Sequence, residues 1–119
     1  MKVFAIRGAT TAIENSVEAI LESTKDMLAQ LMVENNLAKN DLISMFFTTT
    51  SDLNAVFPAR AARELGITNA ALMCAHEMNV EGALPKCIRV MVHVNRESNF
   101  QPKYVYLEEA KKLRPDLFN

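Results

Sequence analysis

The segment that most constrains the fold runs from Cys87 to Val94 and reads CIRVMVHV. The two-residue period of a β-strand places one apolar set on a single face, namely Ile88, Val90, Val92 and Val94. The other face is also mostly apolar, yet it carries Arg89. Arginine keeps its proton and is almost never fully buried without a partner, so we expect an anionic group beside Arg89. That group is either a carboxylate of the protein or a bound ligand.

Length and charge limit the classes of protein to which the chain can belong. Its 119 residues suit one domain over 1–119, and half of them are hydrophobic. The net charge of −1 gives no basic excess, so we expect no nucleic-acid partner. The longest apolar run, Ala70 to Ala75, is far too short to cross a membrane. The apolar stretch after Met1 is too short for a signal peptide, so we expect a cytoplasmic protein.

The cysteines and histidines do not point to a metal or a cofactor. Cys74 and Cys87 are expected to be reduced thiols, because the sequence shows no secretion signal. His76 and His93 are too scattered to complete a metal-binding pattern with them. We therefore expect neither a metal ion nor a cofactor.

Periodicity predicts a mixed α/β (α+β) fold with five strands, one long helix and one short helix. Asn15 is the candidate N-cap of the long helix, because Glu18 follows three residues later. Pro58 fits the start of the short helix, and Gly66 fits its end. The expected strands are 3–7, 42–48, 72–78, 87–94 and, more weakly, 104–112; the helices are 16–35 and 58–65; residues 8–11 form a turn.

This set of elements leaves a packing problem. One long helix can cover only one face of the sheet, but the strands are apolar on both faces, as in sheets that are buried on both sides. A second copy of the chain is the simplest cover for the other face. We therefore expect a homo-oligomer.

The informative residues are the polar ones set among apolar strand positions. On these residues alone, Glu77 and Arg89 could form an internal ion pair that stabilises the sheet or a subunit contact. Arg7, Arg63 and possibly Arg114 would, however, exceed what Glu77 alone can neutralise. An arginine-lined pocket with one carboxylate suits a small dianion that also carries a hydroxyl. The sequence shows no glycine-rich phosphate loop, plausible triad or metal cluster, which leaves chemistry that depends on positioning and electrostatics.

Several motifs occur together in an order that resembles a known family. They are RGATT at 7–11, AVFPARAARELG at 55–66, Cys74 with Glu77 and Met78, CIRVM at 87–91, VYLE at 105–108 and LRPDL at 113–117. Together they cover nearly the whole chain and resemble the monofunctional, trimeric α/β class of chorismate mutase. The resemblance implies a homotrimeric pseudo-α/β-barrel with active sites at the subunit interfaces. It also implies conversion of chorismate to prephenate by a [3,3] rearrangement, on the route to phenylalanine and tyrosine.

The resemblance also implies roles for particular residues. Arg89 matches the arginine that contacts the ether oxygen as its bond breaks, where a fixed cation stabilises the transition state more than the ground state. Glu77 matches the acceptor of the ring hydroxyl's hydrogen bond, with Cys74 beside it. The other matching positions are Arg7 and Tyr106, which hold a substrate carboxylate; Phe57, Ala59, Arg60, Arg63 and Met73, which form pocket walls; and Leu113 and Arg114, in a C-terminal segment that closes over the site.

Two other functions stay open at this point. Small trimeric deaminases that hydrolyse enamines and imines share a related architecture and an interface arginine, but they need no partner for a hydroxyl like Glu77. A non-catalytic trimer that binds an anionic metabolite is the third interpretation. In the chorismate mutase interpretation, Cys74 and Glu77 point to opposite faces of one strand. A bulge or a strand end could bring both into one pocket. We favour a shared pocket, because the doubly apolar sheet already requires burial between subunits. We therefore expect each pocket to take Phe57, Arg63 and Cys74 from one subunit and Arg7, Glu77, Arg89 and Tyr106 from its neighbour.

Overall fold

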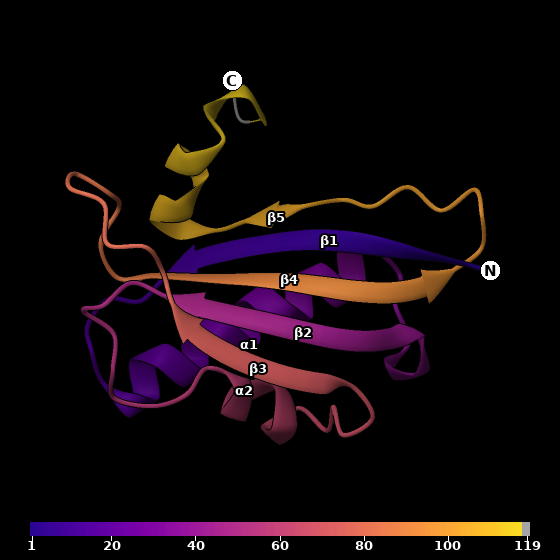
Figure 1. Cartoon of the computed structure of the whole chain (residues 1–119), viewed down its shortest axis with the longest axis horizontal. Coiled ribbons are helices and arrows are strands. Elements are labelled where there is room, and N and C mark those ends of the chain that lie inside the picture. Colours follow the sequence, from indigo (N-terminus) through magenta and orange to yellow (C-terminus); the bar gives the residue numbers. More distant parts are fainter. Residues whose placement is uncertain (118–119) are drawn as a thin grey trace.

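The computed structural model describes residues 1–117, so the last two residues of the expected domain lie outside the described part. Five strands form one sheet in the order β3-β2-β4-β1-β5 (Figure 1). The strands are β1 (Lys2–Thr11), β2 (Leu42–Thr49), β3 (Ala71–His76), β4 (Cys87–Arg96) and β5 (Val105–Tyr106). The helices are α1 (Val17–Glu34), α2 (Ala59–Glu64) and the short 3-10 turns η1 (Lys39–Asp41), η2 (Glu108–Leu113) and η3 (Pro115–Leu117). The predicted mixed five-stranded architecture with a long and a short helix is confirmed.

The central strand of the sheet is β4, which pairs antiparallel with β1 on one side and β2 on the other. The edge strands β3 and β5 run parallel to their neighbours β2 and β1. Both α-helices lie behind the sheet in Figure 1, against the same face. The sheet thus has one face covered by helices, and we call the opposite side the open face.

The covered face holds the main hydrophobic core. The four alternating residues of β4 that the sequence assigned to a core, Ile88, Val90, Val92 and Val94, are all at most 1% exposed. They pack with the buried stripe of α1 and with Met45 and Phe47 of β2. This confirms the two-residue period of β4 and the helical period of α1.

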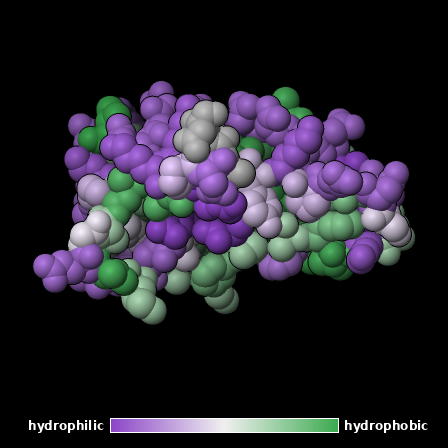
Figure 2. Space-filling model, turned by 90° about the horizontal axis from the view of Figure 1, so that it is seen from above, coloured by the Kyte–Doolittle hydropathy of each residue, from purple (hydrophilic) through white to green (hydrophobic). Residues whose placement is uncertain are grey.

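The open face is apolar as well, but no helix covers it. Large side chains stand exposed on it, among them Val3, Phe46 and Met73, and Met73 is 62% exposed. Seen from above in Figure 2, hydrophobic residues gather toward the lower edge, the side that faces the viewer in Figure 1. The upper edge, where the outer side of α1 lies, is mostly hydrophilic (Figure 2). The sequence prediction that one helix layer leaves one apolar face uncovered is therefore confirmed for this chain.

Both ends of α1 are fixed by side-chain hydrogen bonds. Its N-cap is Ser16, whose Oγ accepts from the Ala19 backbone N–H at 3.1 Å, so the predicted N-cap Asn15 is one residue too early. Asn15 instead lies one residue outside the helix, where its Oδ1 accepts from the backbone N–H groups of Asn54 and Ala55. Asn15 therefore fixes the loop after β2 to the start of the helix.

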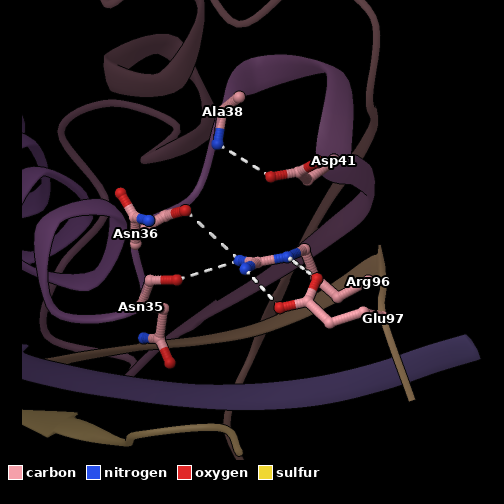
Figure 3. A network of polar contacts seen from close by, with 6 residues as sticks. All are labelled: Asn35, Asn36, Ala38, Asp41, Arg96 and Glu97. Carbon is pink, nitrogen blue, oxygen red and sulfur yellow. Dashed lines mark hydrogen bonds and ion pairs between the residues drawn. The ribbon is translucent and has the colours of Figure 1, made fainter. Parts of the chain in front are cut away.

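At the C-terminal end of α1, an arginine satisfies carbonyl groups that the helix leaves unpaired (Figure 3). Nη1 of Arg96 donates to the backbone oxygens of Asn35 and Asn36 at 3.0 and 3.2 Å. The same guanidinium is oriented by the Glu97 carboxylate at 2.9 Å and stacks 4.5 Å from the Phe100 ring centroid. A cation at this position also complements the negative end of the helix dipole, so Arg96 joins β4 to α1.

Two local predictions were wrong, and one strand departs from regular alternation, for identifiable reasons. Residues 8–11 continue β1 instead of forming a turn, because all four pair with β4. In β2 a bulge between Leu42 and Ser44 buries Leu42 and leaves Ile43 43% exposed, the reverse of strict alternation. Only two residues of the predicted strand 104–112 pair with β1, and 3-10 turns follow.

Gly8 allows α1 to approach the sheet closely. A Cβ at this position would lie 3.0 Å from Val90 Cγ1 and 3.1 Å from Leu31 Cδ1. Both neighbours are buried in the core and have little room to move.

We predict that Gly8→Ala lowers the free energy of unfolding by about 1–3 kcal/mol through overpacking. Urea unfolding at one fixed protein concentration would measure this. Ala29→Ser, on the exposed side of α1, is the control and should stay within about 0.5 kcal/mol of the parent. A Gly8→Ala protein as stable as the parent would show that the contact is not tight.

Candidate functional site

The open face contains a hollow of about 290 Å³ that we call the arginine hollow. It is lined by Arg7, Phe46, Thr48, Glu77, Arg89, Val90 and Met91. Arg7 comes from β1 and Arg89 from the central strand β4, and each faces a residue of the other strand across the antiparallel pair. The sheet register therefore brings together two of the arginines and the one carboxylate that the sequence singled out.

Glu77 is held at the edge of this hollow by β2. It follows β3 directly, and its backbone N–H donates to the Thr49 oxygen at 2.8 Å. Its Oε2 accepts a hydrogen bond from Thr48 Oγ1 and lies 3.4 Å from Arg89 Nε. The expected Glu77–Arg89 ion pair is present, but its closest approach is long and falls on the same oxygen that Thr48 bonds.

Arg89 is not satisfied by this pair. Its Nε is buried and has no hydrogen-bond partner among the described residues. A buried donor without a partner is uncommon and costly in proteins, so it needs a physical reason. A ligand oxygen or a small shift of the pair on binding would supply the missing contact.

A row of paired residues across three strands, which we call the cross-strand row, leads from Arg89 to the β5 edge of the sheet. Arg89 pairs with Ala9 of β1, and Ala9 pairs with Tyr106 of β5. Leu113 packs against the small cluster that contains Tyr106 and Ala9. Arg114 lies close by: Asp116 at 2.9 Å and then the Tyr106 hydroxyl raise the pKa of its guanidinium above the usual range. Tyr106, Leu113 and Arg114 thus lie on the same side of the chain as Arg89.

A second hollow, of about 460 Å³, lies at the end of β3 and is called here the Phe57 pocket. Its lining includes Phe57, Cys74 and His76, together with the loop that follows β2. Phe57 is 70% exposed, although the core is its more usual place. Such an exposed ring beside a hollow suits contact with a ligand or another subunit.

Cys74 lies on the covered side of β3, because it pairs with the buried Phe47 of β2. Burial raises the pKa of its thiol; a hydrogen bond from the Ala59 backbone and the nearby charge of Arg63 act in the opposite direction. Ala59 and Arg63 therefore lie near Cys74, as the sequence grouped them. Since the pKa is raised, the thiol stays neutral at physiological pH and is a poor nucleophile.

Cys74 and Glu77 point to opposite faces of the sheet within one chain, as predicted from their spacing. Two other predicted wall residues are separated from Cys74. Met73 stands on the open face beside Phe46. Arg60 bonds to Glu64 at 2.8 Å on the exposed side of α2. Most of the predicted site residues thus lie around the arginine hollow or around the Phe57 pocket, whereas Met73 and Arg60 lie outside both.

Thr48 is the residue that the sequence prediction missed. It lines the arginine hollow and bonds Glu77, but the sequence predicted no role for it at the site. The signal was the strand period itself, because Ser44, Phe46 and Thr48 alternate onto the same face. The predicted strand 42–48 contains all three residues, so their shared face follows from the period, whereas the contact between Thr48 and Glu77 does not.

Across residues 1–117, no group of three or more His, Cys, Asp or Glu side chains is arranged to hold a metal ion. In the same part of the chain, no helix is both long and apolar enough to cross a membrane.

Comparisons with known proteins agree with this geometry. The model of the family described as "Chorismate mutase type I" matches residues 3–117. "Chorismate mutase AroH" of Bacillus subtilis (strain 168) is 44% identical over 98% of this chain and 94% of its own length. The protein of the same name from Thermus thermophilus is 40% identical over 97% and 96%. A solved structure of chorismate mutase from Clostridium thermocellum, 48% identical, superposes with a TM-score of 0.88 over 92% of this chain and 98% of that one.

The chain folds as a mixed α/β protein with an arginine-lined hollow on the open face of its sheet. The chain belongs to the type I chorismate mutase family, which the family match and both AroH relatives show. This assignment favours the chorismate mutase interpretation over the deaminase and the non-catalytic anion binder.

The two thiols allow a test of the site's electrostatics. Burial raises the pKa of both, and Cys87 is fully buried whereas Cys74 is half-buried. We predict that both react with a disulfide reagent more slowly than free cysteine at pH 7. The rates should rise toward pH 9, since a raised pKa shifts thiolate formation to higher pH.

Labelling of Cys74→Ser and Cys87→Ser separately would assign each rate, with Cys74 expected to react faster. Fast labelling of Cys74 at pH 7 would contradict the assignment of a neutral thiol.

Proposed function

We propose that this chain rearranges chorismate to prephenate at sites shared between the subunits of a cyclic homotrimer. Each site combines the arginine hollow of one subunit with the Phe57 pocket of its neighbour. The observation that carries the proposal is Arg89 on the central strand, with a buried Nε that lacks a hydrogen-bond partner among the described residues. The proposed location of the enzyme is the cytoplasm.

The side chains of the arginine hollow suit the chemistry of this substrate. Chorismate carries two carboxylates and a ring hydroxyl. Arg7 and Arg89 supply fixed positive charge for a carboxylate and the ether oxygen, and Glu77 supplies an acceptor for the hydroxyl. Tyr106 and Arg114 lie at the β5 end of the cross-strand row. They would hold the second carboxylate or close the site.

The rearrangement needs no proton transfer. The ether C–O bond breaks while a new C–C bond forms within the same molecule, and negative charge develops on the ether oxygen. A guanidinium fixed by the sheet at that oxygen stabilises the transition state more than the ground state. Walls that hold the flexible side chain over the ring add a positioning effect. On this account Cys74 is a neutral wall residue.

Assembly is supported by the open face. Its exposed apolar side chains surround another hollow, of about 520 Å³, which is distinct from the Phe57 pocket and is lined by Phe46, Met73 and His93 among others. An apolar sheet face of this kind is normally buried against another layer. Because Cys74 and Glu77 face opposite ways in one chain, a site that uses both needs two chains. A cyclic trimer lets the Phe57 pocket of each copy meet the open face of the next.

Loss of chorismate absorbance with purified, metal-free protein tests the proposed function directly. We expect first-order loss of chorismate with equal formation of prephenate and no added cofactor. Hydrolysis of an enamine or imine without chorismate turnover would favour a deaminase. Binding of anions without any turnover would leave only the non-catalytic interpretation.

We predict that Arg89→Lys lowers kcat by about 10²–10³-fold, because lysine keeps the charge but loses the planar fork. Circular dichroism and sedimentation should show an unchanged fold and assembly. Arg96→Lys is the matched control, since Arg96 lies at the far end of the same strand and contacts α1. An Arg89→Lys enzyme with near-normal kcat would make Arg89 structural.

Shared sites predict complementation between two inactive variants. Arg63→Ala disables the Phe57 side, and Arg89→Ala disables the arginine hollow. Joint refolding in equal amounts should restore about a quarter of parental activity, because each mixed cyclic trimer regains one intact site in three. Mixed trimers that form but stay inactive would place the whole site within one chain.

A further inference from the structure

We propose that Thr48 is a positioning residue that keeps the Glu77–Arg89 pair open, so that Glu77 can accept a hydrogen bond from the substrate. The proposal rests on the proposed function, because it concerns the same site. It assigns Thr48 no contact with the reacting atoms. Instead Thr48 acts through Glu77.

The sheet register places Thr48 between the two charged residues. On β2 it pairs with Arg89 of β4 on one side and with Ala75 of β3 on the other. Glu77 follows β3 two residues beyond Ala75, on the same open side. A hydroxyl on β2 at this level is therefore the group best placed to bond the Glu77 carboxylate beside Arg89.

Thr48 and Arg89 approach the same carboxylate oxygen. Thr48 Oγ1 donates to Glu77 Oε2, and Arg89 Nε lies 3.4 Å from that atom. Glu77 itself lines the arginine hollow, and its Oε1 is the oxygen that neither of these two contacts uses. The next residue, Thr49, holds the Glu77 backbone at 2.8 Å, so consecutive residues of β2 fix both ends of the glutamate.

This arrangement prevents a competing one. An arginine beside a carboxylate tends to form a bidentate pair with two parallel N–H···O bonds. Such a pair would occupy both oxygens of Glu77 and two donors of Arg89, so neither residue would be fully available to a substrate. The Thr48 hydroxyl occupies Oε2 and leaves Arg89 Nε without a bond of its own. The same contact thus explains the long ion pair and the unpartnered nitrogen.

Thr48→Val removes the hydroxyl while keeping the branched shape of the side chain. We expect kcat/KM to fall about 10–50-fold, as Arg89 and Glu77 close into a bidentate pair. Thr48→Ser restores the donor and should stay within about threefold of the parent. Thr24→Val is the matched control: it also deletes a buried Thr hydrogen bond, to the Ile20 oxygen, but lies in α1 away from the site, and should leave kcat/KM unchanged.

A double-mutant cycle with Glu77→Gln separates positioning from a general structural effect. If Thr48 acts through Glu77, adding Thr48→Val to the Glu77→Gln variant should lower kcat/KM by less than about twofold. Losses that multiply, or a Thr48→Ser enzyme as poor as Thr48→Val, would overturn the proposal. Thr48→Ala serves the same cycle if the valine variant does not fold.

A crystal structure of Thr48→Val supplies a readout that does not depend on activity. We expect two Arg89–Glu77 hydrogen bonds of ordinary length in place of the single 3.4 Å approach. An unchanged pair would overturn the proposal even if activity fell. A parent enzyme without chorismate turnover would defeat the proposed function, whereas the geometry of Thr48→Val would still decide whether Thr48 holds the pair open.

Discussion

Everything proposed for this protein depends on a sheet that has helices on only one side. The covered face of β4 has the core residues Val90 and Val92, and the open face of the same strand has Arg89 and Met91. A charge in the middle of an apolar face is costly unless neighbouring groups pair with it and hydrogen-bond to it. Arg89 is only partly paired, because its closest contact with Glu77 is long, at 3.4 Å. Its Nε is left without a hydrogen-bond partner among the described residues, on an apolar face that no helix covers.

In the proposed function, each substrate site consists of two halves with different chemistry. The arginine hollow holds charge and a hydroxyl acceptor, whereas the Phe57 pocket offers an exposed ring and a neutral thiol. In the proposed function, neither half alone forms the complete site. In the proposed trimer the two halves meet, and the hydrophobic effect that closes the open face also assembles the catalytic charges. Burial of the open face would then both stabilise the trimer and complete the active site.

Sequence alone predicted the parts of the fold that depend on periodicity. The alternation in β4 and the helical stripe of α1 identified the covered core correctly, because both patterns extend over several turns or pleats. It failed where a local event changed the register. The bulge at Leu42 exposes Ile43, and pairing with β4 extends β1 through Thr11. Such events are set by tertiary contacts and leave little trace in residue type.

The candidate site was predictable in its charges and less so in its geometry. Arg7, Glu77 and Arg89 stood out as polar residues among apolar neighbours, and the structure brings all three to one hollow. Thr48 did not stand out, because a threonine at a strand end is common and its partner Glu77 comes from the segment just after another strand. Arg60 matched a family motif, yet in this chain it bonds Glu64. Motifs identified which residues matter, and only the sheet register showed which of them meet.

The central claim is that a competent site exists only where two chains meet. Its most direct test is one dilution series of the parent protein in which sedimentation mass and chorismate turnover are measured together. The account predicts a species of three times the 13.3 kDa chain mass, and turnover per chain that falls in step with its dissociation. A monomer that keeps full turnover per chain would contradict it.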